Sequence, residues 1–396
     1  MQNQKNNKIL IVVKNFQIGG IQKASILFIN QVAREFPVDV FAFSNSGPLL
    51  SQIDSKVRIL PPNRFFEIFG DSQNEILKKY GMAWFLIRFL LALHSKIWTF
   101  KLAMRIACKK NHLSENYNIA ISYVQGNNPN SLSSSGTSFF VLNCVNSLRK
   151  IQFIHDDMQP RQVKNALFIN SYSNFDAIFV LSNQIKETVS AFCKNRIFVT
   201  SNLYDTSIIE SDWTAQTNLS NEEPHFLVLA RLSKEKAIPR LINAISKVVL
   251  VNLTPFHLDI YGSGPERGEI ESLISAYSLK TRITLHNEIL KPAKIIRNSD
   301  YLFVTSFDEA RPVVIDEAHL CGTRVFCTKY SSSSEQLYKD DICVENSENG
   351  IIKGFDCLLT NYSRYKKTAS KALFDDKNEQ IFDNFLQNLE QIMNKR

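Results

Sequence analysis

The chain has 396 residues, of which 44% are hydrophobic, and its formal net charge is +8. This length predicts two or three domains with real hydrophobic cores and excludes a fibrous, collagen-like or wholly disordered protein. The moderate positive charge favours acidic partners such as phosphates, nucleotides or anionic lipid heads, without choosing among them.

The start of the chain, MQNQKNNKILIVVKN, has too short an apolar run for a signal peptide, and no apolar run of about 18 residues predicts a spanning helix. The seven cysteines are scattered, odd in number and without Cys/His metal spacing. This pattern suits reduced thiols in a cytosol. We therefore expect a cytoplasmic protein without a metal site.

The first elements predict a Rossmann-like unit. An apolar strand at 8–13 is followed by the loop NFQIGG and by a helix over about 21–36. The full GxGxxG fingerprint is absent, so bound NAD is not indicated. Gly19 and Gly20 could let the backbone approach a phosphate or sugar closely, and an ordinary tight turn is the alternative. Two further strands are expected at 38–44 and 57–60.

Residues 78–110 form an unusual basic segment. They contain eight Lys or Arg, many apolar and aromatic side chains and no acidic residue. The segment predicts one or two basic amphipathic helices, which could lie on an anionic membrane. The alternative is a helix pair that packs on the sheet with a solvated basic face.

The rest of the first half continues the alternation. A strand at 119–123 and a low-complexity loop at 126–138 precede a strand at 150–154, which delivers His155, Asp156 and Asp157 to its carboxyl end. A histidine at that position is a candidate catalytic residue, with a structural role as the alternative. The remaining expected elements are a strand at 175–182, a helix at 183–192, a strand at 197–200 and a polar linker at 201–224.

At Phe226 the strand–helix pattern restarts. The expected strands are 226–230, 256–262, 283–285, 301–305 and 323–328, and the expected helices are 238–251, 266–278, 291–298 and one from Pro312 to near Gly322. Such alternation predicts an α/β fold with a parallel sheet covered on both faces. Two such halves joined by a linker make two Rossmann-like domains with a cleft between them. A last amphipathic helix, with Ile381, Phe385, Leu389 and Ile392 on one face, needs a docking surface.

Four charged residues of the second half suggest chemistry. Arg231 and Lys236 follow the strand at 226–230, and two such cations suit a diphosphate whose charge grows as its bond to a sugar breaks. Glu309 lies on the loop before Pro312 and could accept hydrogen bonds from a transferred sugar. Glu317 lies inside the following helix and could accept hydrogen bonds from a ribose. Arg and Lys here could take the role that Mg²⁺ has elsewhere.

These motifs resemble the retaining GT-B glycosyltransferases of family 4, the glycosyl transferases group 1, of the capsule, exopolysaccharide and lipopolysaccharide type. The matching stretches, in order, are ARLSKEKA, IYGSGPER, SDYLFVTSFDEARPVVIDEA, CGTRV and the later Ser334-Glu335. In the first half, GGIQKASILFINQVA resembles the family's glycine loop and first helix. KIQFIHDD resembles its HxD strand end, and VTSNLYD resembles the segment that ends the N-terminal domain.

The resemblance implies two Rossmann-like domains facing each other across a cleft. Residues 1–204 would bind the acceptor, residues 205–377 would bind the nucleotide sugar, and helix 378–396 would dock back on the N-terminal domain. The roles it implies are donor diphosphate binding by Arg231 and Lys236, ribose binding by Glu317, donor-sugar binding and catalysis by Glu309, a place at the catalytic centre for His155, and backbone contacts from Gly19, Gly20, Pro312 and Val313.

The family usually has glycine where this chain has Ala230 and Ala237, and glycine is common at the position of Ala310. The added methyl groups could narrow the phosphate site or select a different donor. The charged side chains are all present, so we expect a working site.

We therefore expect an enzyme that moves a sugar from a nucleotide-diphosphate sugar to a lipid-linked glycan, with retention, in bacterial surface polysaccharide synthesis. It would work without a metal or other cofactor, in the cytoplasm and peripherally on the membrane. The alternatives are a catalytically silent scaffold of a polysaccharide complex, or a sugar-nucleotide epimerase or phosphorylase on the same fold. A nucleic-acid partner is not expected, because the sequence contains no recognition motif.

Overall fold

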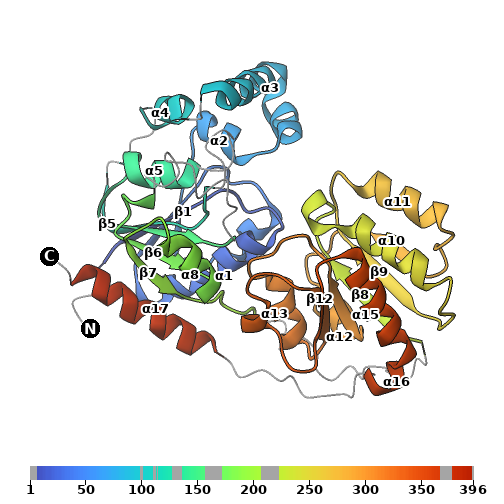
Figure 1. Ribbon diagram of the computed structural model, residues 1–396. Coiled ribbons are helices and arrows are strands. Elements are labelled where there is room, and N and C mark those ends of the chain that lie inside the picture. The colour runs from blue at the N-terminus through green and yellow to red at the C-terminus, as the bar shows by residue number, and fades with distance from the viewer. Residues whose placement is uncertain are drawn as a thin grey trace. The chain divides into compact units, whose positions relative to one another are not determined.

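The computed structural model describes residues 7–98, 101–109, 113, 115–126, 136–156, 172–206, 223–365 and 377–394. The chain divides into two compact units, each with its own sheet (Figure 1). The N-terminal unit comprises Met1–Leu203 and Lys377–Arg396, and the C-terminal unit comprises Tyr204–Asp376. Asp157, residues 127–135 of the expected loop and residues 207–222 of the expected linker lie outside the described residues.

The N-terminal unit is built on a seven-stranded parallel sheet of order β3-β2-β1-β4-β5-β6-β7. Its strands are β1 Ile9–Val13, β2 Val38–Ala42, β3 Arg58–Leu60, β4 Asn116–Ser122, β5 Asn146–Ile154, β6 Ala177–Val180 and β7 Arg196–Val199. All five residues of β1 are buried because the strand lies inside the sheet and helices cover both faces.

Its helices connect the strands. They are α1 Gly20–Glu35, α2 Arg64–Gly70, α3 Gln73–Trp98, α4 Lys101–Lys109, α5 Gly136–Cys144, α8 Asn183–Ser190 and α17 Asn378–Met393. The basic segment expected at 78–110 forms α3 and α4, and Gly81 interrupts α3 with a φ of 78°. The expected loop at 126–138 is wrong at its end, because Gly136–Ser138 begin α5, whose Phe140 and Val141 are fully buried.

Helix α17 packs on the N-terminal unit, which confirms the docking predicted from its apolar face. The ring of Phe385 lies 5.0 Å from that of Phe28 and 5.3 Å from that of Phe179. The buried side chains of α17 are Phe382, Phe385, Leu389 and Ile392. Phe382 therefore takes the buried place expected for Ile381, and Ile381 lies at the rim of the interface.

The C-terminal unit is built on a six-stranded parallel sheet of order β10-β9-β8-β11-β12-β13. Its strands are β8 His225–Leu229, β9 His257–Tyr261, β10 Ile283–His286, β11 Tyr301–Val304, β12 Arg324–Thr328 and β13 Ile342–Val344. Its helices are the short η2 Lys234–Lys236, α10 Ile238–Val248, α11 Arg267–Ala276, α12 Ala293–Arg297, α13 Val313–Leu320, α14 Ser333–Gln336, α15 Glu348–Thr360 and α16 Tyr362–Tyr365.

Two hydrophobic clusters cover the two faces of this sheet. One places Phe226 and Phe303 against α10, α11 and α15, and the other places Leu227 and Val325 against α12 and α13. Alternate residues of a strand thus face opposite layers, as the period of a strand requires. The α/β fold with two parallel, doubly covered sheets is confirmed.

One expectation about the cysteines is wrong. Cys108 of α4 and Cys144 of α5 form a disulfide with a Cα–Cα distance of 5.8 Å, where the sequence suggested reduced thiols throughout. The two residues are 36 positions apart, and only the packing of α4 beside α5 brings them together. Within the described residues, no helix is both long enough and apolar enough to span a membrane.

Candidate active site

The C-terminal unit brings Lys236 and Glu309 into direct contact. Lys236 ends η2, just after β8, and Glu309 lies on the loop between β11 and α13. The Nζ atom of Lys236 lies 2.5 Å from Oε1 of Glu309, and the hydroxyl of Ser306 donates to the same oxygen at 2.6 Å. The two charged side chains are 24% and 12% exposed, so the pair is largely withdrawn from water but still accessible.

This pair borders a cavity at the carboxyl ends of β8 and β11. Its other lining residues include Val228, Ala230, Phe303, Thr305 and Val314. Ligands of open α/β sheets bind at the carboxyl ends of their strands. The cavity therefore lies at the edge of the sheet where such folds take their ligands.

Arg240 fixes the loop that carries Glu309. Its guanidinium donates to the carbonyls of Thr305 at 2.6 Å and Ser306 at 3.2 Å, and to Oδ1 of Asn346 at 2.8 Å. It also lies 4.3 Å from the ring centre of Phe307. The sequence reasoning missed this residue. A signal was present, because a cation in the first turn of a helix opposes the helix dipole and calls for another partner.

The loops around Lys236 and Glu309 are also joined to each other through backbone atoms. The amide of Phe307 donates to the carbonyl of Glu235 at 2.9 Å. Beside them, the GSGP turn closes on the loop after β8, since the amide of Leu232 donates to Ser263 at 2.8 Å. A Cβ at Gly262 would lie 2.0 Å from the carbonyl oxygen of Ala230, so this approach requires glycine.

The start of α13 is hydrogen-bonded to side chains of the segment around α14. Pro312 is the N-cap residue and Val313 is the first helical residue. Gln336 donates to the carbonyl of Pro312 at 3.0 Å, and the hydroxyl of Ser332 donates to the carbonyl of Ala310. Glu317, one turn further, is 6% exposed. The N-terminal amides of α13 thus follow directly on the loop of Glu309, an arrangement that suits an anion.

Arg231 has a different environment. Its side chain is 70% exposed and its guanidinium pairs with Glu235 at 2.9 Å, not with the Lys236–Glu309 pair. Ala237, next to Lys236, has a φ of 53°, a left-handed conformation that glycine adopts at lower cost. The structure therefore explains the family's usual glycine at position 237. Ala230 is not among the residues with positive φ.

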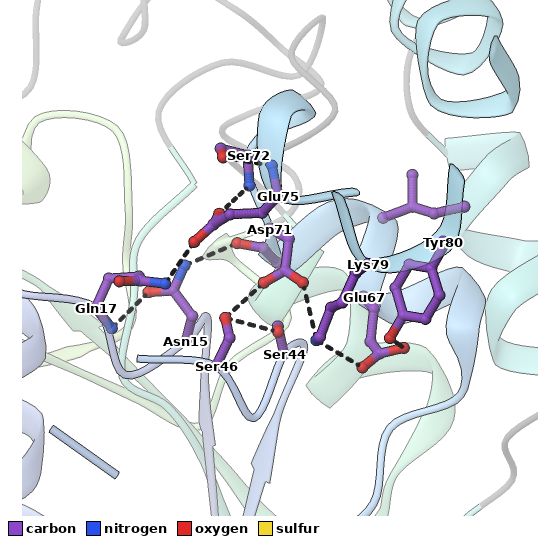
Figure 2. A network of polar contacts seen from close by, with 12 residues as sticks. Asn15, Gln17, Ser44, Ser46, Glu67, Asp71, Ser72, Glu75, Lys79 and Tyr80 are labelled. Atoms are coloured by element: carbon purple, nitrogen blue, oxygen red, sulfur yellow. Dashed lines mark hydrogen bonds and ion pairs between the residues drawn. The ribbon is translucent and has the colours of Figure 1, made fainter. Parts of the chain in front are cut away.

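In the N-terminal unit, a polar network supports the loop that leads from β1 to α1 (Figure 2). Asn15 donates to the carbonyl of Gly70 at 2.7 Å, and Gln17 donates to Glu75 at 2.6 Å. Glu75 also accepts from the amide of Ser72 at 2.7 Å, which closes a capping box at the start of α3. The loop is therefore tied to α2 and α3.

A buried carboxylate lies at the centre of this network. Asp71, whose side chain is fully buried, accepts from Ser46 at 2.6 Å and pairs with Lys79 at 3.3 Å (Figure 2). Burial alone would lower the pKa of Lys79, but the charges of Asp71 and Glu67 outweigh it and raise that pKa. Lys79 is therefore charged at neutral pH, and its bonds to Asp71 and Glu67 tie α3 to the end of α2.

The glycine pair ends this supported loop. Gly19 is the N-cap residue of α1 and Gly20 is its first residue. A Cβ at Gly19 would meet the side-chain oxygen of Gln22 at 2.4 Å, and this flexible side chain could move aside. The structure therefore places both glycines at a helix N-terminus at the carboxyl edge of the sheet.

His155 directly follows β5 at the same edge of the sheet. Its ring lies 4.6 Å from that of Tyr123, and its backbone amide donates to Oε1 of Gln125 at 2.6 Å. Burial lowers the pKa of His155 to about 4, so the ring is neutral at pH 7. Within the described residues, its Nε2 atom has no hydrogen-bond partner. A buried ring nitrogen without a partner costs free energy unless a ligand uses it.

The described residues contain no group of three or more His, Cys, Asp or Glu side chains that could hold a metal ion. The metal independence expected from the sequence stays a prediction. In the C-terminal unit, the ammonium of Lys236 and the amides that open α13 are available for a phosphorylated ligand.

Comparisons with known proteins complete this description. Residues 210–373 match the family model "Glycosyl transferases group 1". A search of curated proteins finds no match. Among solved structures, Anabaena HepE in complex with UDP and glucose has a TM-score of 0.67 at 15% identity, over 98% of this chain and 100% of that one. S. aureus TarM, in a complex that contains UDP, has a TM-score of 0.69 at 15% identity, over 98% and 100%.

Sucrose-phosphate synthase from Thermosynechococcus elongatus also matches, with a TM-score of 0.64 at 17% identity over 98% of this chain and 96% of that one. At such low identity these likenesses establish the fold alone. Together with the two parallel sheets, they identify it as GT-B, as the sequence predicted.

Proposed function

We propose that this glycosyltransferase, whose C-terminal unit belongs to the glycosyl transferases group 1 family, moves a sugar from a UDP-sugar donor to a glycan acceptor with retention of anomeric configuration. The choice of UDP is supported by solved structures of the same fold in complex with UDP, including those of HepE and TarM. The choice of a glycan acceptor, lipid-linked and part of a surface polysaccharide, rests on the sequence resemblance.

The contact between Lys236 and Glu309 carries this proposal. Withdrawing two charges from water costs free energy of folding, because water solvates each charge better. A role in ligand binding would explain why the chain keeps such a pair at a cavity. A donor diphosphate would take the ammonium of Lys236 as its partner, and the donor sugar would supply hydroxyl groups to Glu309. The pair thus holds both charges in place until the donor separates them.

The proposed roles follow from this exchange. Lys236 and Arg231 stabilise the charge that grows on the diphosphate as the glycosidic bond breaks. The exposed guanidinium of Arg231 would first leave Glu235. Glu317 binds the ribose, Glu309 supports the oxocarbenium-like transition state, and the amides near Pro312 and Val313 face the donor. Within the N-terminal unit, we propose backbone contacts with the donor for Gly19 and Gly20 and a catalytic role for His155.

Sugar transfer from UDP-glucose and UDP-GlcNAc, with and without EDTA, tests the site. We expect Lys236→Ala and Glu309→Gln each to lower kcat by about 10²–10³-fold, the loss typical of removing one group that stabilises a transition state. Lys234→Ala is the matched control, because Lys234 lies on the same short helix but is exposed. Full activity of both site variants would disprove the assignment, and loss of activity in EDTA would disprove metal independence.

The α3 helix is the proposed contact with a membrane. Its exposed apolar residues are Met82, Leu86, Ile87, Phe89, Leu90 and Leu93. Lys78 is exposed at its start, and Arg105 and Lys109 are exposed on α4. Lys79 is exposed too, but it pairs with Asp71 and Glu67. Arg88 is an exception to the basic surface, because its guanidinium donates to the carbonyl of Ile68. An apolar stripe with exposed cations suits the surface of an anionic bilayer, where a lipid-linked acceptor is found.

The catalytically silent scaffold is the alternative that the alanines at positions 230 and 237 favoured. The structure weakens this argument at position 237, because Ala237 occupies the left-handed conformation there and Lys236 still reaches Glu309. A scaffold would bind UDP without turnover, so the assay described above distinguishes the two functions.

A further inference from the structure

The edge of the C-terminal sheet holds two thiols side by side. Cys327 of β12 is paired in register with Cys343 of β13, in parallel strands. Neighbouring strands lie about 4.8 Å apart, and disulfides form across Cα–Cα distances of roughly 4.4–6.8 Å. Cys327 is buried and Cys343 is exposed. The register therefore allows a bond between the two sulfurs after a small local movement.

The two thiols also differ in reactivity. A hydrogen bond from the thiol of Cys327 lowers the pKa of Cys343 to about 7, helped by Ser333 and Lys329 and opposed by burial. The same hydrogen bond, together with burial, raises the pKa of Cys327. An exposed thiol with a large thiolate fraction beside a second thiol has the features of a redox-sensitive pair.

We propose that Cys343 and Cys327 are a peroxide-sensitive pair that closes into a reversible disulfide. The thiolate of Cys343 attacks hydrogen peroxide, which forms a sulfenic acid and releases hydroxide. The sulfur of Cys327 then attacks that sulfenic sulfur, which forms the S–S bond and releases water. The sum converts two thiols and one peroxide into one disulfide and two waters, and a dithiol reductant reverses it.

The two strands lead directly into the supports of the Glu309 loop. Thr328, the residue after Cys327, donates to the carbonyl of Ser306 at 3.0 Å. Asn346, shortly after Cys343, donates to the carbonyls of Phe307 at 2.9 Å and Lys329 at 3.1 Å. Drawing the two strands together would shift these supports. We therefore expect the disulfide to weaken donor binding, a consequence that rests on the proposed function.

The chemical step is tested on the full chain without any assay of transfer. The protein is treated with hydrogen peroxide at pH 7, its remaining thiols are blocked, and its peptides are analysed by mass spectrometry. We expect a linked Cys327–Cys343 peptide that disappears on reduction. In Cys327→Ser, we expect a sulfenic acid at Cys343 that dimedone traps. Cys357→Ser, at another exposed cysteine, should behave as the unmodified chain.

The rate of alkylation gives a second readout. At pH 7, Cys343 should react with iodoacetamide roughly three to ten times faster than free cysteine, because its larger thiolate fraction outweighs its lower intrinsic nucleophilicity. Equal rates, or peroxide products at Cys343 without any link to Cys327, would overturn the proposal.

UDP binding by calorimetry tests the consequence for the site. We expect the oxidised chain to bind UDP at least fivefold more weakly than the reduced chain, and Cys343→Ser to lose this sensitivity to peroxide. Unchanged affinity of the disulfide form would overturn the link to the site. No UDP binding by the reduced chain would instead count against the proposed function, while the linked peptide would still establish the thiol pair.

Discussion

Ala237 stands where the glycosyltransferases that this sequence resembles usually have glycine. Ala237 has a φ of 53° and ψ of 35°, where an L-residue with a Cβ is strained. We predict that Ala237→Gly raises the free energy of unfolding by about 0.5–1 kcal/mol, because glycine adopts this conformation without that strain. Urea denaturation of the full chain measures the change.

Ala230→Gly is the matched control for this substitution. Ala230 also stands where the family usually has glycine, but it is not among the residues with positive φ. Its replacement should leave stability unchanged or lower it, because glycine adds conformational entropy to the unfolded chain. A gain of stability in both variants, or in neither, would contradict the conformational explanation.

His155 predicts a sensitivity to acid. Its pKa is lowered to about 4 by burial, below the ordinary value of about 6.5 that the unfolded chain should show. Between these values the unfolded state binds more protons, so stability falls as the pH falls. By linkage, this pKa shift contributes ~3 kcal/mol to the free energy of unfolding at neutral pH. The contribution is lost as the pH falls from about 6.5 to 4. In His155→Gln this loss should disappear, and urea denaturation at several pH values would show it.

His225 provides a contrast of opposite sign. Its ring lies 2.7 Å from Asp259, and this hydrogen bond raises the pKa of His225 despite burial. Its contribution to the free energy of unfolding is therefore present at low pH and lost as the pH rises through the raised pKa. His225→Gln should reduce stability at pH 6 more than at pH 9. The same trend in both histidine variants would refute the assigned shifts.

The elements of the fold were largely predictable where a strand is wholly apolar. The run ILIVV became β1 and YLFV became β11, because both strands are buried on both faces. Prediction failed where the first residues of a strand are exposed, or where a helix lacks a clear apolar pattern. Residues 146–149 of β5 are partly or fully exposed and gave no apolar run, and α15 was not predicted.

The candidate site divides in the same way. Glu309 and Lys236 could be named from the sequence because their loops follow apolar strands. The partners of Arg240 could not be named, because residues 305, 306 and 346 are distant in the sequence and meet only in the fold. The pairing of the charges was not predicted either, since Arg231 bonds to the exposed Glu235 four residues away and Lys236 bonds to Glu309.

The exposed stripe of α3 predicts a measurable affinity for lipid. Leu90 is 61% exposed on this helix, and its burial in an interface would gain about 1.5–3 kcal/mol. We predict that Leu90→Asp weakens sedimentation with vesicles of anionic phosphatidylglycerol at least tenfold, and that 0.5 M salt weakens it further. Its melting temperature should stay within a few degrees of the unmodified chain, because the side chain makes few contacts to lose.

Leu250→Asp is the control for this experiment. Leu250 is 80% exposed between α10 and β9 of the C-terminal unit, so the same change in charge and hydrophobicity falls away from α3. The control should bind vesicles as the unmodified chain does. If both variants lost binding, the effect would reflect overall charge, and if neither did, the α3 surface would not be the membrane contact.

At the scale of the whole molecule, the chain forms the core of one unit, then that of the other, and returns to the first. The clusters around Phe41 in the N-terminal unit and around Phe226 in the C-terminal unit share no residues. Helix α17 belongs to the N-terminal unit although 173 residues of the other unit, Tyr204–Asp376, precede it. The last helix therefore stabilises the fold that the first strand began.

This arrangement predicts two unfolding transitions in calorimetry. Phe385→Ala should lower the free energy of unfolding of the N-terminal unit by about 3–5 kcal/mol. The substitution removes a buried ring that contacts Phe28, Phe153 and Phe179. UDP at a hundredfold excess over its Kd should raise the free energy of unfolding of the C-terminal unit by about 2.7 kcal/mol. Phe355→Ala, which opens the core beneath α15, should lower the transition that UDP raises. If Phe385→Ala and UDP moved the same transition, the two units would unfold as one, and the donor and the C-terminal helix would be thermodynamically coupled through the whole chain.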